Sequence, residues 1–317
     1  MGRIITIGEP MVMFIANEEG PLEEVYNFTK ALAGSEVNVA IGLARLGHKV
    51  SYITRLGDDP FGKYIYKFLV NENIDVSYIK FDNEYPTGFQ LKSKTRIGDP
   101  EVVYFRKWSA ASHIQENDLK EINFDDVNHI HLTGIPPALS LSFRKTIYNI
   151  VEIAKTKNIL ISFDPNIRKQ LWKSEEEMRS ILNDIAFRCD IVLPGYEEGK
   201  ILTGYNELND IASFYLEKGT KIVIIKTGEK GAFVKTPTEE YTVSGFKVEQ
   251  IVDTVGAGDG FAVGVISGLL ENLSLREAVK RGNAIGARVI MFPGDNDGLP
   301  NRENLEKFIM THSIREG

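Results

Sequence analysis

Residues 250–264 constrain the fold more than any other part of the chain. A segment of low polarity runs into Gly256-Ala257-Gly258, and the apolar pattern that follows is typical of a buried helix. The first amides of a helix lack partners within it and the helix dipole is positive there, so glycines at this point favour a bound anion. Asp259 follows, where a carboxylate would repel a phosphate. It is either a base that takes a proton from an attacking hydroxyl or a cap of the helix.

The segment Asp253-Thr254-Val255-Gly256-Ala257-Gly258-Asp259-Gly260-Phe261 resembles the C-terminal signature of the ribokinase-like (PfkB-type) sugar kinases. The resemblance implies that Asp259 is the catalytic base and that the amides of Gly256, Ala257 and Gly258 form the anion hole. It also implies that the chain transfers a phosphoryl group from ATP, with Mg²⁺, to a sugar.

A second signature lies near the N-terminus. Residues 33–40, Ala-Gly-Ser-Glu-Val-Asn-Val-Ala, resemble the N-terminal signature of the same family. They begin a helix that we predict to end at Gly47, with Ser35 as its cap. The resemblance implies that Gly34 and Asn38 contact the sugar, whereas the residues alone leave open a tight turn and a surface asparagine.

Composition excludes several classes of protein. A chain of 317 residues with 43% hydrophobic residues is long enough for one large domain with a sizeable core. The net charge of −7 argues against a general nucleic-acid or anionic-membrane partner. Cys189 is the only cysteine, so the sequence predicts no disulfide framework and no cysteine metal site. No apolar run approaches the ~20 residues that span a bilayer, and we expect a cytoplasmic protein.

Strand and helix patterns alternate along the chain. Strands are predicted at residues 3–8, 50–55, 127–132, 158–163, 190–193 and 221–226, with helical patterns between them, including residues 142–157. Asp58 or Asp59 is expected to cap the helix that ends at Asn71, and Gly62 to permit close packing. We predict one doubly wound α/β domain over residues 1–317, with a mostly parallel sheet and helices on both faces.

Two segments depart from this alternation of strands and helices. Residues 87–95 and 101–107 alternate as two strands joined by a turn at 96–100, and strands are also expected at 11–16 and 25–30. We interpret the segments at about 11–31 and 84–108 as a small β-sheet lid. Alternation places Val102, Tyr104 and Arg106 on one face, where Tyr104 and Arg106 reach the same bound molecule or lie on an exposed strand. Lids in the family close over the sugar and often pair between subunits, which implies a homo-oligomer.

Three further segments are similar to those of the 2-keto-3-deoxygluconate kinases within the family. They are Tyr104-Phe105-Arg106-Lys107, Asp164-Pro165-Asn166-Ile167-Arg168 and Met291-Phe292-Pro293-Gly294-Asp295. The similarity implies that Tyr104, Arg106 and Arg168 bind the carboxylate and keto end of a sugar acid, with Asp295 bonded to a hydroxyl. Planar, always-charged guanidinium groups suit a carboxylate. Gln90 stands where many relatives have tyrosine and is a further substrate candidate.

The resemblance also implies a nucleotide site and two ion sites. The residues implied for the nucleotide are Asn166, Lys226, Thr227, Gly228, Lys230, Gly231, Gly256, Gly258, Asn283 and Ala287. Glu198 is implied to hold Mg²⁺ through water, although the asparagine that accompanies it in many relatives is replaced by Gly195 here. Asp253 occupies a position that binds a monovalent cation such as K⁺ in some relatives. His129 and His131 alternate on a strand without a recognisable third ligand, so we interpret them as core or loop histidines and not as a metal pair.

The sequence leaves two other functions open. In the first, the chain is a kinase of a neutral sugar such as fructose or ribose, and Arg106 and Arg168 serve the nucleotide or the lid. In the second, it is a non-catalytic sugar or nucleotide sensor on the same fold. The intact Asp259 argues against the sensor, because a sensor does not need a base.

Overall fold

The computed structural model describes residues 2–95 and 100–315, so most of the turn predicted at 96–100 lies outside the described residues. The strands are β1 (Arg3–Ile7), β2 (Met11–Glu19), β3 (Phe28–Ala33), β4 (Lys49–Gly57), β5 (Ile79–Asp82), β6 (Phe89–Lys94), β7 (Val102–Phe105), β8 (Val127–Thr133), β9 (Leu160–Asp164), β10 (Ile191–Val192), β11 (Ile222–Lys226), β12 (Ala232–Lys235) and β13 (Glu240–Val243). The α-helices are α1 (Ser35–Arg45), α2 (Pro60–Asn71), α3 (Pro136–Leu139), α4 (Leu141–Thr156), α5 (Glu175–Ala186), α6 (Tyr196–Thr203), α7 (Leu208–Leu216), α8 (Ala257–Leu270), α9 (Leu275–Val289) and α10 (Arg302–Thr311).

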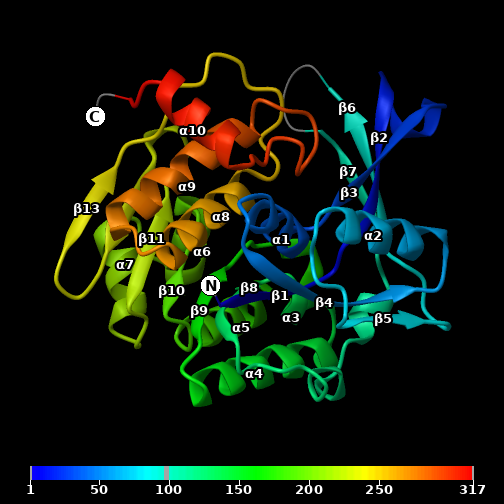
Figure 1. Cartoon of the computed structure of the whole chain (residues 1–317), viewed down its shortest axis with the longest axis horizontal. Helices are drawn as coiled ribbons and strands as arrows, with labels where there is room; N and C mark the ends of the chain where they lie inside the picture. The colour runs from blue at the N-terminus through cyan, green and yellow to red at the C-terminus, as the bar shows by residue number, and fades with distance from the viewer. Residues whose placement is uncertain (1, 96–99, 316–317) are drawn as a thin grey trace.

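The strands form two sheets (Figure 1). The large sheet has nine strands in the order β13-β12-β11-β10-β9-β8-β1-β4-β5. Its strands from β11 to β5 pair in parallel, and only β12 and β13 at one edge run antiparallel. The small sheet has the order β3-β2-β6-β7 and is built from the two segments predicted to leave the α/β rhythm. The predicted α/β fold class is therefore confirmed.

The two faces of the large sheet carry separate hydrophobic cores. Ile4 of β1 packs in the core that α1, α8, α9 and α10 cover. Ile5 and Ile7 point to the opposite face, into the core beneath α4, α5 and α7. Successive side chains of a strand alternate between faces, so a strand buried on both sides is apolar throughout. This arrangement explains why isoleucines occupy successive positions, on both faces, of the first strand.

Of the two helix caps predicted from the sequence, one agrees with the structure and one differs. Asp59 caps α2 by accepting a hydrogen bond from the amide of Gly62, at 2.8 Å. A side chain at Gly62 would strike the carbonyl oxygen of Gly57, so close packing at this glycine is confirmed. Ser35, however, is the first residue of α1 and does not cap it; Gly34 is the N-cap residue. Ser140 caps α4, which therefore begins one residue before the predicted start.

The histidine pair on β8 is part of the core. His129 and His131 are buried, and one ring nitrogen of each lies 2.7 and 2.8 Å from Oγ of Ser162. Burial lowers the pKa of both imidazoles to about 3, so both are neutral. Within residues 2–95 and 100–315, no group of three His, Cys, Asp or Glu side chains is placed to hold a metal ion. The interpretation as core histidines is confirmed.

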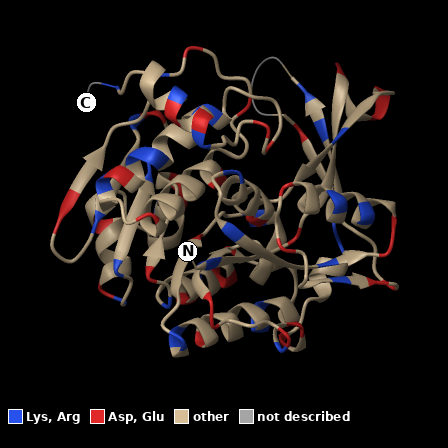
Figure 2. Ribbon diagram, in the orientation of Figure 1, with Lys and Arg blue, Asp and Glu red and all other residues tan. Residues whose placement is uncertain are grey.

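Acidic and basic residues are interspersed over the outer helices (Figure 2). No helix in the described part of the chain is both long and apolar enough to cross a bilayer. The four-stranded sheet, by contrast, has one apolar side. Phe14 and Phe89 pack there against Phe61 of α2 with their rings edge-on or tilted, and the Phe89 ring lies parallel to that of Phe105 at 4.6 Å.

Candidate functional site

The glycine turn before α8 places Asp259 in the first turn of that helix. Gly256 has a φ of 82°, and a Cβ at this position would lie 2.4 Å from the carbonyl oxygen of Asp295. Glycine alone satisfies both the backbone conformation and the close approach. The N-terminus of α8, with its unpartnered amides, is consequently open toward the cavity in which Asp259 lies.

Two residues of the N-terminal signature hold the carboxylate of Asp259. The hydroxyl of Ser35 donates to Oδ1 at 2.6 Å, and the side-chain amide of Asn38 donates to Oδ2 at 2.8 Å. Asn38 is buried and is not a surface residue. Gly34, with a φ of 139°, lets α1 begin against the backbone of Glu9, where a Cβ would lie 2.8 Å from the carbonyl oxygen. The two signatures therefore meet at one carboxylate.

Burial controls the protonation of Asp259. Desolvation raises the pKa of its carboxyl to about 6, although the hydrogen bonds from Ser35 and Asn38 oppose the shift. The negative charge of Asp164 raises the pKa further and the positive charge of Arg168 lowers it. A carboxylate with a pKa in this range is ionised at neutral pH and is a better proton acceptor than an exposed one.

All of the residues predicted to bind substrate line one cavity of about 500 Å³. They are Gly34, Asn38, Gln90, Tyr104, Arg106, Arg168, Asp259 and Asp295. The cavity lies where α1, the start of α8 and the ends of β9 and β11 face the small sheet (Figure 1). Gln90 and Tyr104 enter it from β6 and β7, so the predicted alternation on these strands is confirmed. Parallel strands end at a common edge, which is where sheets of this kind bind ligands.

The two arginines of the cavity differ in their partners. Arg106 is buried and its Nε donates to Oε2 of Glu9 at 2.6 Å, while Ser109 donates to the other oxygen of the same carboxylate. Arg168 is half-buried and has no carboxylate or hydrogen-bond partner for its side chain among residues 2–95 and 100–315. Its charge lowers the pKa of both Asp259 and Asp295. Arg168 is therefore a guanidinium in the cavity that forms no ion pair with the described residues.

A second cavity, of about 450 Å³, adjoins the first and shares Lys226, Thr254 and Gly258 with it. Six of the residues predicted to bind nucleotide line it, namely Lys226, Gly228, Gly231, Gly258, Asn283 and Ala287. Asn166 and Gly256 line the first cavity instead. Thr227 and Lys230 line neither cavity, and the hydroxyl of Thr227 donates to the carbonyl of Gly231 within the turn after β11.

Charged side chains lie where the two cavities adjoin. Nζ of Lys226 lies 2.5 Å from Oδ2 of Asp164. Burial alone would lower its pKa, but the carboxylates of Asp164 and Glu198 raise the pKa of Lys226 above the usual value. Glu198 accepts hydrogen bonds from the amides of Ile167 at 2.7 Å and Gly195 at 2.8 Å. Lys226 is therefore a permanent cation beside Gly258.

The residues that sequence reasoning missed are mostly charged residues brought together by packing. They are Glu9, Ser35, Glu36, Lys92 and Asp164. Glu36 is buried and accepts a hydrogen bond from Thr133, and burial raises its pKa to about 7. Lys92 forms an ion pair with Asp253, the residue expected to bind a monovalent cation. Gln90 was predicted from the resemblance to the family, and strand alternation places Lys92, two positions further along β6, on the same face.

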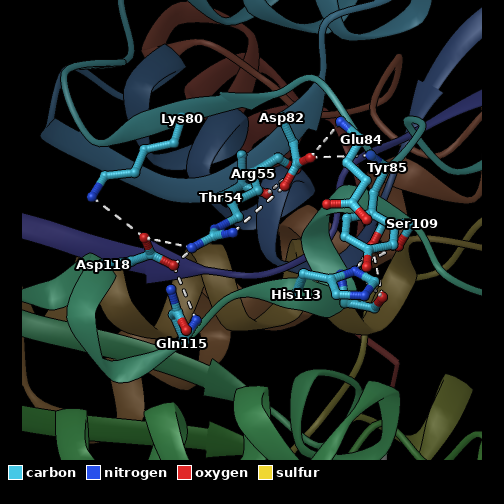
Figure 3. A network of polar contacts seen from close by, with 11 residues as sticks. Thr54, Arg55, Lys80, Asp82, Glu84, Tyr85, Ser109, His113, Gln115 and Asp118 are labelled. Carbon is cyan, nitrogen blue, oxygen red and sulfur yellow. Dashed lines mark hydrogen bonds and ion pairs between the residues drawn. The ribbon is translucent and has the colours of Figure 1, made fainter.

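A polar network outside the cavity anchors the β6–β7 hairpin (Figure 3). Asp82, at the end of β5, accepts hydrogen bonds from the amides of Glu84 and Tyr85 at 2.9 and 3.0 Å. The ring of Tyr85 stacks on His113 at 3.5 Å. His113 in turn lies 3.0 Å from the carbonyl of Ser109. The chain entering the hairpin is thus tied to the chain leaving it, which fixes where Gln90 and Arg106 enter the cavity.

Comparison with known proteins identifies the family of this chain. The model of the pfkB family of carbohydrate kinases matches residues 1–302. The 2-dehydro-3-deoxygluconokinase of Bacillus subtilis (strain 168) is 48% identical over 96% of this chain and 94% of that protein. A 2-dehydro-3-deoxygluconokinase of Thermoproteus tenax is 31% identical over 98% and 94%. A 5-dehydro-2-deoxygluconokinase of Geobacillus thermodenitrificans (strain NG80-2) is 32% identical over 96% and 92%.

Solved structures show the same architecture. A PfkB protein from Polaromonas sp. JS666 superimposes with a TM-score of 0.90 at 44% identity, over 96% of this chain and 99% of that one. A putative ribokinase II from E. coli, in complex with ATP and Mg²⁺, gives 0.91 at 27% identity, over 98% and 100%. A double-mutant fructokinase from Vibrio cholerae O395, with fructose, ADP and potassium ion, gives 0.87 at 26% identity, over 97% and 98%. The chain therefore belongs to the pfkB family of carbohydrate kinases, phosphotransferases that act on a sugar hydroxyl.

Proposed function

We propose that this kinase transfers the γ-phosphoryl group of ATP to the C6 hydroxyl of 2-keto-3-deoxygluconate (2-dehydro-3-deoxygluconate), giving 2-keto-3-deoxy-6-phosphogluconate. The observation that carries the proposal is the pair of adjoining cavities that share Lys226, Thr254 and Gly258. Asp259 lies in the first, Asn283 and Ala287 in the second. In-line phosphoryl transfer requires the acceptor hydroxyl and the nucleotide to meet end to end, and this shared rim provides that meeting point.

Asp259 acts as the general base in this proposal. Ser35 and Asn38 hold both carboxylate oxygens, so the carboxylate keeps one orientation and is ionised above about pH 6. It accepts the proton of the C6 hydroxyl as that oxygen attacks phosphorus. The oxygen bonds to phosphorus, the bond from phosphorus to the β-bridging oxygen breaks, and ADP leaves with the electron pair of that bond.

The negative charge that develops on the phosphoryl group meets two fixed positive features. One is the N-terminus of α8, where the amides of Ala257 and Gly258 have no partner within the helix. The other is Lys226, whose Nζ lies 3.4 Å from the position that a Cβ on Gly258 would occupy. Preorganised donors of this kind supply a large share of the rate enhancement of a kinase.

The second cavity fits a nucleotide. Phe246, Val248, Ile251 and Phe261 give it an apolar lining, and Asn283 is bonded through Nδ2 to the carbonyl of Val243 at 2.9 Å. The phosphates of a nucleotide bound in this cavity would lie at the residues shared with the first cavity, beside the N-terminus of α8. Mg²⁺ would supply positive charge to the phosphates, and it prefers water and phosphate oxygens to an all-protein cage. Among the described residues no group of three His, Cys, Asp or Glu side chains is placed to hold a metal ion, and Glu198 lines the first cavity. The proposal assigns Glu198 a contact with the hydrated ion.

The arginines of the first cavity favour an acid over a neutral sugar. Arg168 contributes a guanidinium without an ion-pair partner among the described residues, and Arg106 adds a second one that is paired with Glu9. A carboxylate satisfies Arg168, whereas a neutral hydroxyl would leave that charge without a counter-ion. The names of the relatives agree on this class, because 2-dehydro-3-deoxygluconate and 5-dehydro-2-deoxygluconate are both keto-deoxy sugar acids.

The small sheet is proposed to act as the lid of a single domain, and its apolar side as a subunit contact. Phe105 remains 47% exposed there, and β3 and β7 are the edge strands of this sheet. Paired lids would shield the apolar side and keep water from the reacting groups. We place the protein in the cytoplasm, where ATP is supplied.

The substrate assignment is tested by ADP release with Mg²⁺–ATP. The panel contains 2-keto-3-deoxygluconate, its galacto epimer, 5-keto-2-deoxygluconate, gluconate, fructose and ribose. We expect kcat/KM for the keto-deoxy acids to exceed that for fructose and ribose by about 10²-fold, since the cavity would otherwise hold an unpaired charge. A preference for fructose or ribose would overturn the sugar-acid assignment. Binding of sugar and nucleotide by calorimetry without any ADP would identify a sensor.

A further inference from the structure

Three buried charged side chains from distant parts of the chain meet beside the anion hole. Lys92 lies on β6 of the small sheet, Asp253 precedes the glycine turn, and Asp295 follows α9. The Lys92 ammonium forms an ion pair with Oδ2 of Asp253 and lies 3.5 Å from Oδ1 of Asp295. The three side chains are only 5%, 10% and 7% exposed. All three charged side chains are therefore largely withdrawn from solvent.

The cluster supports the turn that forms the anion hole from two sides. Asp253 is three residues before Gly256, and its Oδ1 accepts a hydrogen bond from the amide of Val255 at 3.1 Å. On the other side, the carbonyl oxygen of Asp295 is the atom against which Gly256 packs. A change in the charge between Asp253 and Asp295 would therefore move the backbone on which the anion hole depends.

The carboxylates of Asp253 and Asp295 both lie next to the Lys92 ammonium, and both are stabilised by a cation between them. Without one, each would keep its desolvation penalty and repel the other. Burial and the charge of Asp253 indeed raise the pKa of Asp295, while Lys92 lowers it. The resemblance noted in the sequence implies that Asp253 binds a monovalent cation. That ion does not fit this chain, because the Lys92 ammonium already contacts the Asp253 carboxylate.

We propose that Lys92 is a built-in monovalent cation: its ammonium holds Asp253 and Asp295 together, positions the anion hole, and makes turnover independent of K⁺. The ammonium carries the same charge as K⁺ and, like it, is surrounded by oxygen atoms. Lys92 is a positioning residue in this account, because it acts through the turn at Gly256. The proposal rests on the proposed kinase function only where activity is the readout.

The first test compares monovalent cations on the unmodified enzyme. ADP release is measured in chloride salts of K⁺, Na⁺ and tetramethylammonium at matched ionic strength of about 0.1 M, with whichever panel sugar is accepted. We expect rates that agree within about twofold, since the charge at Asp253 is already compensated. Activation by K⁺ of about tenfold or more over tetramethylammonium would overturn the proposal.

The second test removes the built-in cation. Lys92→Ala should lose about tenfold or more of kcat in tetramethylammonium chloride and recover part of it in KCl or methylammonium chloride, which restore a cation between the carboxylates. Lys94→Ala, at an exposed position two residues along the same strand, is the matched control and should show no cation response. A Lys92→Ala enzyme that is fully active, or that responds to no cation, would contradict the proposal.

The third test needs no substrate and no activity. The thermal midpoint of Lys92→Ala should rise in KCl relative to tetramethylammonium chloride, because a cation that binds only the folded state stabilises it. The double variant Lys92→Ala/Asp253→Asn has fewer uncompensated charges, should fold, and should lose this response. Equal midpoints of Lys92→Ala in both salts would overturn the cation replacement. A failure of the substrate panel alone would leave this result intact and count only against the proposed function.

Discussion

Asp259→Asn should reduce kcat by about 10²–10⁴-fold, the range that a positioned base contributes. The amide cannot accept the proton of the attacking hydroxyl, yet it has nearly the shape of the carboxylate. Ionised Asp259 is buried, and burial raises its pKa to about 6, so above that pH the charge lowers the stability of the folded state. The variant should therefore fold and keep a thermal midpoint at least as high as the unmodified protein near neutral pH. Steady-state ADP release and thermal unfolding measure the two effects.

The pH profile separates the base from a helix cap. A base must be ionised, so kcat/KM of the unmodified enzyme should fall about tenfold per pH unit below pH 6, and the residual activity of Asp259→Asn should lack this limb. Asp58→Asn, at a surface aspartate paired with Lys63, is the matched control and should leave the profile unchanged. Near-normal turnover of Asp259→Asn would reduce this residue to a structural role.

Arg168→Ala should lower kcat/KM for the keto-deoxy acid by about 10²-fold, which corresponds to about 3 kcal/mol for a lost charge-assisted contact with a carboxylate. Arg168 has no hydrogen-bond or ion-pair partner among the described residues, so its removal breaks no such contact and the protein should still fold, while the pKa of Asp259 and of Asp295 should rise. The effect should appear mainly in KM. Kinetics with the sugar acid and with fructose at high concentration provide the comparison.

Two further variants show whether the loss of kcat/KM is specific to the proposed contact between Arg168 and the substrate carboxylate. Arg188→Ala removes a guanidinium that pairs with Asp184 and Glu152 away from the cavity, and should change neither sugar. Arg106→Ala should weaken sugar-acid binding as well, but it also leaves Glu9 buried without its partner and should lower the thermal midpoint. If Arg168→Ala impairs fructose as strongly as the sugar acid, the guanidinium serves the nucleotide or the lid and the carboxylate site is wrong.

The sequence predicted those parts of the site that local chemistry controls. Gly256 and Asp259 follow from the need for a glycine turn at a helix N-terminus, and the alternation of β7 placed Tyr104 and Arg106 on the cavity face. The period of a strand and the start of a helix are local properties, so single-sequence reasoning reaches them. Ser35 shows the limit, because its residue type favours a cap while the structure uses its hydroxyl to hold Asp259.

Pairings across the chain could not be predicted in the same way. Glu9 meets Arg106 across 97 positions, and Lys92 meets Asp253 across 161. The sequence around Lys92 or Arg106 does not identify the partner of either residue, because these contacts depend on how the small sheet packs against the large one. For the same reason, Thr227 and Lys230 were assigned to the nucleotide from the turn alone, although neither lines a cavity.

The position of the new phosphate on the sugar acid tests whether the C6 hydroxyl is the acceptor. We propose that the carboxylate of the sugar acid lies at Arg168 and that its other end lies at Asp259, so only the terminal hydroxyl reaches the glycine turn. The measurement is proton–phosphorus NMR of the product formed from 2-keto-3-deoxygluconate and Mg²⁺–ATP. Coupling of phosphorus to the two C6 protons is the predicted result. Coupling to the C4 or C5 proton, or a phosphate on the carboxyl group, would mean that the substrate lies in the cavity in another orientation.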